Sequence, residues 1–264
     1  MKRFLHNVYN LMALCGIDLI KAFKSITVLP FYFHDRKIIK QQMRLSKIDF
    51  PFGRSFPILW DRFSESGETK GHYFHQDLLI ARKIFQNKPN LHVDIGSRID
   101  GFVAHVASFR KIEIFDIRLS TSSIYNVTFT KADLMGEIEN SLIEYCDSIS
   151  SLHVLEHFGL GRYGDSIKYD GYLDGLDNIH KILKKGGKFY FSVPIGPQRI
   201  EFNAHRVFCL RYLLDLLNEG YKLNSFSYVD DNGDLHENVI LDETKIMNNY
   251  GCYYGCGIFE MTKL

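Results

Sequence analysis

Hydrophobic and polar positions follow two alternating rhythms from about residue 72 onward. Stretches with helical spacing, such as "HQDLLIARKIFQN" and "GFVAHVASF", are separated by short apolar runs such as "LHVDIG" and "KIEIFDIR". Apolar side chains every three to four residues are typical of amphipathic helices, and short apolar runs bounded by Gly or Asp are typical of buried strands. The order of these elements predicts a β-α-β repeat, an α/β fold in which a mostly parallel sheet has helices on both faces.

The same rhythm continues to the end of the chain. We predict strands in "NVTFTKAD", "CDSISSLHVL" and "KFYFSVP", helices in "DGLDNIHKILKKGG" and "CLRYLLDLLNEG", and two late strands in "YKLNSFSYVD" and "YYGCGIFEMTKL". Glycine after the last helical residue is a typical helix stop. Ligands of such sheets bind at the carboxyl ends of the strands, so we expect the chemistry in the loops that follow the strands.

Residues 1–70 lack this rhythm, and we predict that they form an N-terminal helical extension to a main domain at 71–264. The extension begins basic and turns apolar, which is also how a signal peptide or a membrane anchor begins. Asp18, Lys21 and Lys24 interrupt the apolar run well short of the ~20 residues that span a bilayer. We therefore predict no transmembrane segment.

A rough helical face remains in this extension. We predict that the face packs on the main domain or on a second subunit. In the second case the protein would be a homo-oligomer. The alternative is an interfacial helix whose basic side chains lie near lipid headgroups, a peripheral membrane contact. The apolar face consists of Leu11, Leu14, Ile17, Leu19 and Ile20, and the basic side chains are Lys2, Arg3, Lys21 and Lys24.

Composition narrows the class of protein. The 264 residues are 45% hydrophobic and 14% aromatic, which is enough for a substantial core. Lys and Arg number 32 against 31 Asp and Glu, so no global basic field favours a nucleic-acid partner. Five cysteines do not resemble a disulfide framework in a chain of this size, and we expect a cytoplasmic location. Cys252 and Cys256 have no second pair with ligand spacing, so we expect free thiols there.

The segment "SLHVLEHFGLGRYGD" places His153, Glu156 and His157 within five residues. The same H-x-x-E-H spelling occurs in a class of zinc peptidases, where the two histidines hold the ion. Here the motif lies at the end of a predicted strand, and residues four apart in a strand are about 13 Å apart, too far for two ligands of one ion. We therefore predict no metal ligands, and a metallohydrolase built on this motif is an alternative.

The junction "VDIGSRIDG" follows the first predicted strand of the repeat. A dinucleotide-binding loop would have the pattern G-x-G-x-x-G, but Arg98 occupies the place of the glycine that lets the backbone approach a pyrophosphate. Asp94 and Asp100 in this loop favour a cationic ligand by charge, and S-adenosylmethionine carries a sulfonium and an ammonium group. The next strands end at Asp116 and Asp133. A carboxylate at the end of the second strand can accept hydrogen bonds from both hydroxyls of a ribose.

The segments that carry a family resemblance, in the expected order, are "VDIGSRIDGF", "IFDIR", "KADL", "SLHVLEHF", "LKKGGKFYFSVP" and "GIFEMTK". Over residues 72–264, the sequence resembles the class I S-adenosylmethionine-dependent methyltransferases. The segments "GHYFHQD", "DIGSRIDGFVAH", "EHFGLGRYGD" and "FNAHRVF" are similar to a branch of that superfamily associated with bacterial polysaccharide and glycosylation gene clusters. The resemblance implies a Rossmann-like sheet of seven strands with an antiparallel last strand. It also implies S-adenosylmethionine as the cofactor.

The resemblance further implies how the cofactor binds. Asp94 and Gly96 would lie on its methionine side, Asp116 would bind the ribose, and Asp133 would lie near the adenine amino group. The loop departs from the superfamily at Arg98 and the acid two residues later, where glycines are usual. We also assign to the cofactor Ser97, Leu134 and His153.

Methyl transfer to a hydroxyl needs an in-line arrangement and removal of the hydroxyl proton. His157 follows the fourth strand, beside the expected methyl group, and histidine titrates near neutral pH, so we predict that it is the general base with Glu156 beside it. The alternative is that His157 only hydrogen-bonds its own loop. The glycine-rich loop after it allows a tight path or a mobile lid. The candidate acceptor-binding residues are His72, His75, Arg162, Tyr163, Asp165, Asn203 and His205.

The predicted function is O-methylation of a small-molecule or glycan acceptor, such as a sugar or a glycan precursor. A second hypothesis keeps the fold and the cofactor but makes the chain a non-catalytic partner subunit in glycan assembly. A turnover assay with candidate acceptors distinguishes the two.

Overall fold

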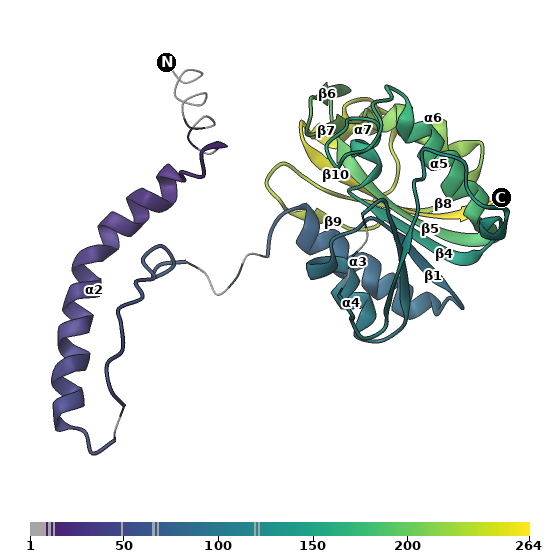
Figure 1. Cartoon of the computed structure of the whole chain (residues 1–264). Helices are drawn as coiled ribbons and strands as arrows, with labels where there is room; N and C mark the ends of the chain where they lie inside the picture. Colours follow the sequence, from purple (N-terminus) through teal and green to yellow (C-terminus); the bar gives the residue numbers. More distant parts are fainter. Residues whose placement is uncertain are drawn as a thin grey trace. The chain divides into compact units, whose positions relative to one another are not determined.

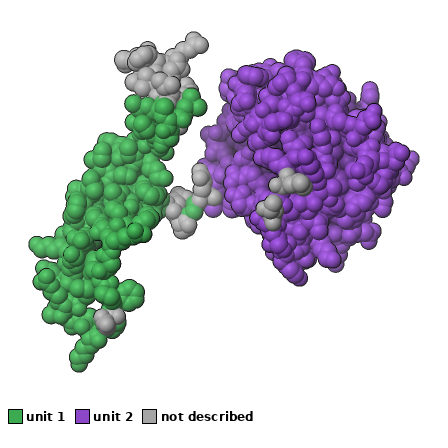
Figure 2. Space-filling view, in the orientation of Figure 1, with its two compact units in different colours: residues 1–68 green, residues 69–264 purple. Residues whose placement is uncertain are grey.

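The computed structural model describes residues 9, 12, 14–48, 50–64, 67, 69–118, 120 and 122–264. The chain divides into two compact units, Met1–Glu68 and Thr69–Leu264 (Figure 2). Lys2, Arg3 and Leu11 of the predicted N-terminal face lie outside the described residues.

Unit 1 is built on one long helix, α2 (Leu19–Leu45). The Asp18 side chain accepts a hydrogen bond from the backbone N–H of Lys21 at 2.9 Å and so caps the first turn. The segment after α2 contacts the helix, since Lys21 Nζ lies 4.1 Å from the ring centre of Trp60. None of the helices in the described part of the chain combines the length and the apolar content that a bilayer span requires. The large apolar side chains exposed on α2 include Ile20, Phe23, Ile26, Phe33 and Ile39.

Unit 2 is built on one large sheet. Its strands are β1 (His92–Ile95), β2 (Ile112–Asp116), β3 (Val127–Lys131), β4 (Cys146–Leu152), β5 (Leu183–Ile195), β8 (Tyr221–Val229), β9 (Leu235–His236) and β10 (Gly255–Lys263). They lie in the order β3-β2-β1-β4-β5-β10-β8-β9. The first five pair in parallel, and β10 is antiparallel to both of its neighbours. The predicted Rossmann-like sheet with an antiparallel last strand is confirmed, and β9 adds a short eighth strand at the edge.

Helices cover both faces of this sheet (Figure 1). They are α3 (His72–Asn87), α4 (Ala104–Ala107), α5 (Gly171–Ile182), α6 (Leu210–Asn218) and α7 (Glu243–Met247). Successive strand residues point to opposite faces. In β5, Phe189 and Phe191 belong to the core under α5, α6 and α7, and Tyr190 belongs to the core under α3 and α4. The two cores therefore lie on opposite faces of the sheet, and the parallel pairing places the carboxyl ends of β1 to β5 at one edge.

Several local elements differ from the predicted ones. A π-helical turn, η1 (Ile99–Val103), precedes α4 and takes up much of the predicted helix. The Lys-Lys-Gly-Gly run begins β5 instead of ending α5, because α5 stops at Ile182. A small hairpin of β6 (Arg199–Glu201) and β7 (His205–Val207) was not predicted, since strands of three residues carry too little periodicity to be recognised.

Candidate functional site

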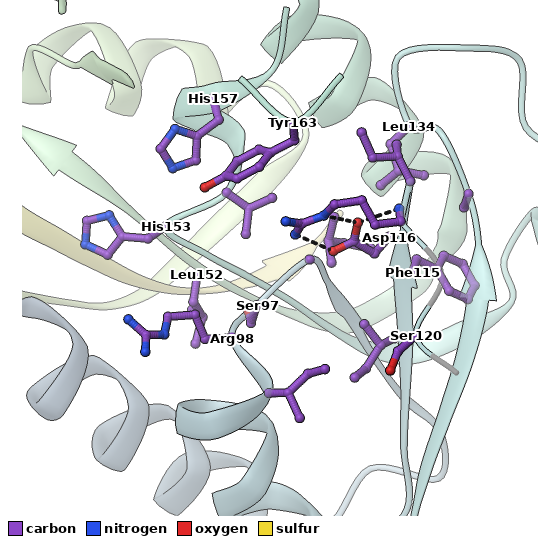
Figure 3. A pocket seen from close by; sticks show the side chains of 18 of the residues that line it. Ser97, Arg98, Phe115, Asp116, Ser120, Leu134, Leu152, His153, His157 and Tyr163 are labelled. Carbon is purple, nitrogen blue, oxygen red and sulfur yellow. Dashed lines mark hydrogen bonds and ion pairs between the residues drawn. The ribbon is translucent and has the colours of Figure 1, made fainter. Parts of the chain in front are cut away.

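A cleft of about 670 Å³ opens at the carboxyl ends of β1, β2 and β4. This is the edge at which a parallel sheet of this kind binds its ligands. His153, His157 and Tyr163 lie toward one side of the cleft, and Phe115 and Leu134 lie toward the other (Figure 3). The predicted site residues that line the cleft are Gly96, Ser97, Asp116, Leu134, His153, His157, Arg162 and Tyr163.

The turn after β1 is organised by the buried carboxylate of Asp94. This carboxylate accepts hydrogen bonds from Ser97 N at 2.9 Å, Ser97 Oγ at 2.8 Å and Ser150 Oγ at 2.5 Å. Burial raises the pKa of Asp94 to about 6, although the hydrogen bonds from Ser150 and Ser97 lower it. Gly96 has a φ of +61°, and a Cβ there would lie 3.1 Å from Val154 Cγ1. Asp94 thus lies behind the cleft wall and positions Ser97, which lines the cleft.

Asp116, the last residue of β2, has its carboxylate paired with an arginine in the cleft. Arg118 donates to it from the backbone N at 2.8 Å, from Nε at 3.1 Å and from Nη2 at 2.9 Å (Figure 3). The Arg118 guanidinium also lies 4.5 Å from the ring centre of Tyr163. A ligand that donates hydroxyl protons to Asp116 therefore competes with Arg118. Arg118 is not among the predicted site residues, although its place two residues after a strand-ending aspartate is a usable signal.

The chain after β4 is not extended as far as His157, in contrast to the prediction that the H-x-x-E-H motif lies at a strand end with strand spacing. His153 has a φ of +55°, and residues Leu155–His157 form a 3-10 turn, η3. The strand spacing of about 13 Å therefore does not apply to the histidines of the H-x-x-E-H motif. The two imidazoles have different partners, since His153 Nδ1 lies 2.7 Å from Glu156 Oε1 and His157 Nδ1 lies 2.6 Å from Ala204 O.

The contact with Ala204 fixes the tautomer of His157. A carbonyl oxygen only accepts, so the Nδ1 of His157 carries the proton and donates it. The Nε2 atom of a neutral His157 then keeps a lone pair. Burial lowers the pKa of His157, and Arg162 lowers it further, against the opposing effect of the Glu156 carboxylate. A neutral imidazole with a free Nε2 lone pair is the form that accepts a proton.

Hydrogen bonds fasten the glycine-rich loop that follows. Both carboxylate oxygens of Asp165 accept from the loop backbone, Oδ2 from Gly159 N at 2.9 Å and Oδ1 from Tyr163 N at 3.1 Å. The buried guanidinium of Arg206 donates to Phe158 O at 2.6 Å and to a second loop carbonyl. Of the two predicted alternatives for this loop, a tight path or a mobile lid, these hydrogen bonds favour the tight path. Asp165 lies outside the cleft lining and shapes the loop that presents Tyr163.

Residues 103–250, more than half of the chain, match the family described as "Caenorhabditis protein of unknown function, DUF268". The chain belongs to this family. The family description gives no activity, and the search among curated proteins found no match for this DUF268 chain.

Solved structures similar to the DUF268 chain include 1,6-didemethyltoxoflavin-N1-methyltransferase of Burkholderia thailandensis, crystallised with 1,6-didemethyltoxoflavin and S-adenosylhomocysteine. It is 15% identical, with a TM-score of 0.50, over 71% of this chain and 78% of that chain. The N-methyltransferase NodS of Bradyrhizobium japonicum WM9 is 11% identical, with a TM-score of 0.47, over 73% of this chain and 88% of that chain. The similarity to the B. thailandensis structure, at a TM-score of 0.50 and only 15% identity, concerns the fold alone: unit 2 has the Rossmann-like methyltransferase fold.

The other predicted site residues of the DUF268 chain lie outside the cleft lining. The Asp133 carboxylate accepts from Met135 N at 2.9 Å, the His72 ring centre lies 5.1 Å from that of His153, and His205 Nε2 lies 3.2 Å from Glu201 Oε2. The residues outside the lining are Asp94, Asp133, Glu156, His72, His75, Asp165, Asn203 and His205.

The sequence analysis also overlooked Tyr73, which lines the cleft from the first turn of α3. Its ring centre lies 5.2 Å from that of His153 and 5.5 Å from the Arg98 guanidinium. The segment "GHYFHQD" had drawn attention for its histidines, and the tyrosine between them was the signal that went unused.

Two glycines in the glycine-rich loop after His157 allow a matched test of the tight path of that loop. Gly159 and Gly164 have φ values of +75° and +82°; a Cβ at Gly159 would lie 1.9 Å from Lys168 O, whereas a Cβ at Gly164 would meet nothing within 4 Å. We expect Gly164→Ala to lower the free energy of unfolding by about 1 kcal/mol, the cost of a left-handed alanine. Gly159→Ala should cost about 1 kcal/mol more, from the overpacking. Urea denaturation measures both, and equal losses would contradict the close approach of Gly159 to Lys168.

Proposed function

We propose that the protein is an S-adenosylmethionine-dependent methyltransferase that methylates a hydroxyl of a small-molecule or glycan acceptor. The main support is the meeting of Gly96 and Asp116 in the cleft, where a Cβ on Gly96 would lie only 3.8 Å from Asp116 Oδ2. A strand-end carboxylate beside a glycine turn suits a nucleoside, because the two ribose hydroxyls donate to the carboxylate while the turn leaves room for the ligand. The similar B. thailandensis enzyme holds S-adenosylhomocysteine.

The rest of the cleft suits the other parts of this cofactor. Ile114, Phe115 and Leu134 provide an apolar wall for the adenine ring. Near the turn after β1, the Asp94 carboxylate is buried, and this burial opposes its ionised form. A sulfonium or ammonium group bound nearby would favour that ionised form by Coulomb attraction.

We assign the general base to His157. In the proposed reaction the acceptor oxygen attacks the methyl carbon, the carbon–sulfur bond breaks, and S-adenosylhomocysteine leaves. The hydroxyl proton passes to His157 Nε2, the ring nitrogen left with a lone pair by the hydrogen bond of Nδ1 to Ala204 O at 2.6 Å. The resulting imidazolium would be stabilised by Glu156, whose Oε1 lies 3.9 Å from Nε2.

The proposed acceptor side is formed by Arg162 and Tyr163. The Arg162 guanidinium lies 5.1 Å from the Tyr163 ring centre, and its Nη1 donates to Ala204 O at 3.0 Å. An aromatic ring beside a guanidinium suits a sugar, because the ring packs on the sugar carbons while the guanidinium donates to hydroxyl or acidic groups. The glycan class of the acceptor also draws on the resemblance of "EHFGLGRYGD" to the glycosylation-associated branch.

Calorimetry on the full chain tests the cofactor, and release of S-adenosylhomocysteine with a panel of sugars and sugar nucleotides tests the reaction. We expect S-adenosylmethionine and S-adenosylhomocysteine to bind and at least one sugar to turn over. If neither cofactor form binds, the proposal fails. Binding without turnover on any sugar, amine or carboxylate acceptor would favour the non-catalytic partner subunit instead.

The proposed base predicts how turnover depends on pH. Burial lowers the pKa of His157, as do Arg162 and His153, whereas Glu156 and the bond to Ala204 raise it. Neutral imidazole accepts the proton, so kcat should fall with decreasing pH only below about 6.5, the ordinary pKa of histidine. A kcat profile between about pH 5 and 8 measures this. In His157→Ala the residual activity should lose this acid limb; an acid limb of unchanged midpoint in the variant would assign it to another group.

A further inference from the structure

Three side chains from three distant segments meet beside the cleft. His72 begins α3, His153 follows β4, and Cys256 lies in β10. A ring nitrogen of each histidine and the Cys256 Sγ atom lie within 4.8 Å of one another. We propose that His72, His153 and Cys256 bind a zinc ion. This site goes beyond the proposed methyl transfer and does not depend on it.

The hydrogen bond of His153 leaves one nitrogen of its ring for the ion. His153 Nδ1 lies 2.7 Å from Glu156 Oε1, while His153 Nε2 is buried and has no hydrogen-bond partner among the described residues. Histidines that bind metal commonly donate their other N–H to a carboxylate or a carbonyl in this way.

Charge also favours a cation at this place. Glu156 is only 1% exposed, and its Oε2 atom has no hydrogen-bond partner in the described part of the chain. A buried carboxylate is costly unless a positive charge offsets it. Zinc bound to the Cys256 thiolate would carry one net positive charge, and the Glu156 carboxylate, joined to the site through His153, would neutralise it.

The ligand set selects the type of metal. Two imidazole nitrogens and one thiolate sulfur suit zinc, whereas calcium and magnesium prefer oxygen ligands. Ligand atoms of a tetrahedral zinc site lie roughly 3.3–3.8 Å apart, given the usual bond lengths. The three ligand atoms, which lie within 4.8 Å of one another, therefore have to close by up to about 1 Å when zinc binds. Three protein ligands leave a fourth position for water or another oxygen, and His153 also lines the cleft.

The proposed site differs from the H-x-x-E-H motif of the sequence analysis. It shares His153 with that motif but takes its other ligands from α3 and β10 instead of from His157. In the sequence, Cys256 forms a recognisable pattern only with Cys252, because pairing with a histidine so far away along the chain leaves no spacing pattern.

Metal analysis of the full chain, purified without a polyhistidine tag, tests the proposal. The protein is stripped with a chelator, reloaded with zinc and dialysed; we expect one zinc per chain by mass spectrometry. Cobalt in place of zinc should give the absorption band of a thiolate–cobalt bond. Zinc that stays well below one per chain would overturn the proposal.

Variants identify the ligands. Cys256→Ser and His72→Ala should each abolish stoichiometric zinc, and Glu156→Gln should weaken zinc binding roughly 10–100-fold through His153. Cys252→Ser, a buried cysteine outside the group, is the matched control and should keep the zinc. Circular dichroism of the metal-free forms checks that each variant folds. His72 is half-buried at the start of a helix, so His72→Ala should disturb the fold less than Cys256→Ser, which changes a buried strand residue. Zinc retained by both Cys256→Ser and His72→Ala, or lost only in His157→Ala, would refute the site. These readouts use the metal itself, so failure of the methyltransferase proposal leaves them interpretable.

Discussion

Replacement of His157 by alanine is expected to lower turnover by a factor of roughly 10²–10⁴ and to leave the affinity for S-adenosylmethionine unchanged. The imidazole lines the cleft, and its Nδ1 is held by Ala204 O at 2.6 Å, so Nε2 is presented as a proton acceptor in a fixed orientation. Alanine removes the acceptor, and no step of the reaction then removes the hydroxyl proton as effectively. The affinity should not change, because the proposed cofactor contacts come from Gly96, Asp116 and their neighbours. Turnover with the sugar acceptor and calorimetry of the cofactor measure the two quantities.

Other histidines of unit 2 serve as rivals in the same assay. His75 lies on α3, and His205 Nε2 lies 3.2 Å from Glu201 Oε2 and has its ring 6.4 Å from that of His157. His72 has the proposed zinc as a separate reason to matter, so its variant is compared at equal zinc content. If His157→Ala keeps near-normal turnover and His75→Ala or His205→Ala loses it, the base has been misassigned. If all of the variants stay active, positioning alone carries the reaction.

Much of the fold could be predicted because its signals are local. The longer strands of the sheet coincide with the runs predicted as strands, and α3, α5 and α6 have helical spacing. β6, β7 and β9 were missed because two or three residues cannot display a period. α2 was predicted as a helical region but not over its full 27 residues, since many of its apolar side chains are exposed and form no single face.

In the candidate site, too, some features could be predicted from the sequence and others could not. Asp116, Gly96 and His157 could be predicted to line one cleft because each lies at the end of a strand or shortly after it, and the carboxyl ends of parallel strands share one edge. The left-handed backbone at His153, with a φ of +55°, could not be predicted, because a non-glycine residue adopts it only where its surroundings impose it. The meeting of His72 and Cys256 could not be predicted from the sequence either, since it depends on α3 packing on the face of the sheet to which Cys256 of β10 belongs.

Asp116→Ala is expected to weaken the binding of S-adenosylmethionine and S-adenosylhomocysteine by a factor of roughly 10–150, equivalent to about 1.5–3 kcal/mol, the usual contribution of hydrogen bonds to a charged group. The carboxylate ends β2 in the cleft and can accept from both ribose hydroxyls at once. Alanine offers neither acceptor. Calorimetric titration of each ligand into the wild-type protein and the variant measures the difference.

Replacement of Arg118, the residue paired with Asp116, is the control that shows why Asp116→Ala loses cofactor affinity. In the protein alone Arg118 holds both carboxylate oxygens, through Nε at 3.1 Å and Nη2 at 2.9 Å, with its side chain 55% exposed. Ribose hydroxyls must take these oxygens from Arg118, so Arg118→Ala should leave the affinity unchanged or tighten it. Asp100, an acid in the cleft lining with a 72% exposed side chain paired to Arg98, is the matched acid, and Asp100→Ala should have a much smaller effect than Asp116→Ala. If Arg118→Ala weakens binding as much as Asp116→Ala does, the loss comes from a disturbed turn after β2 and not from the ribose contact. Unchanged affinity in Asp116→Ala would remove Asp116 from the cofactor site altogether.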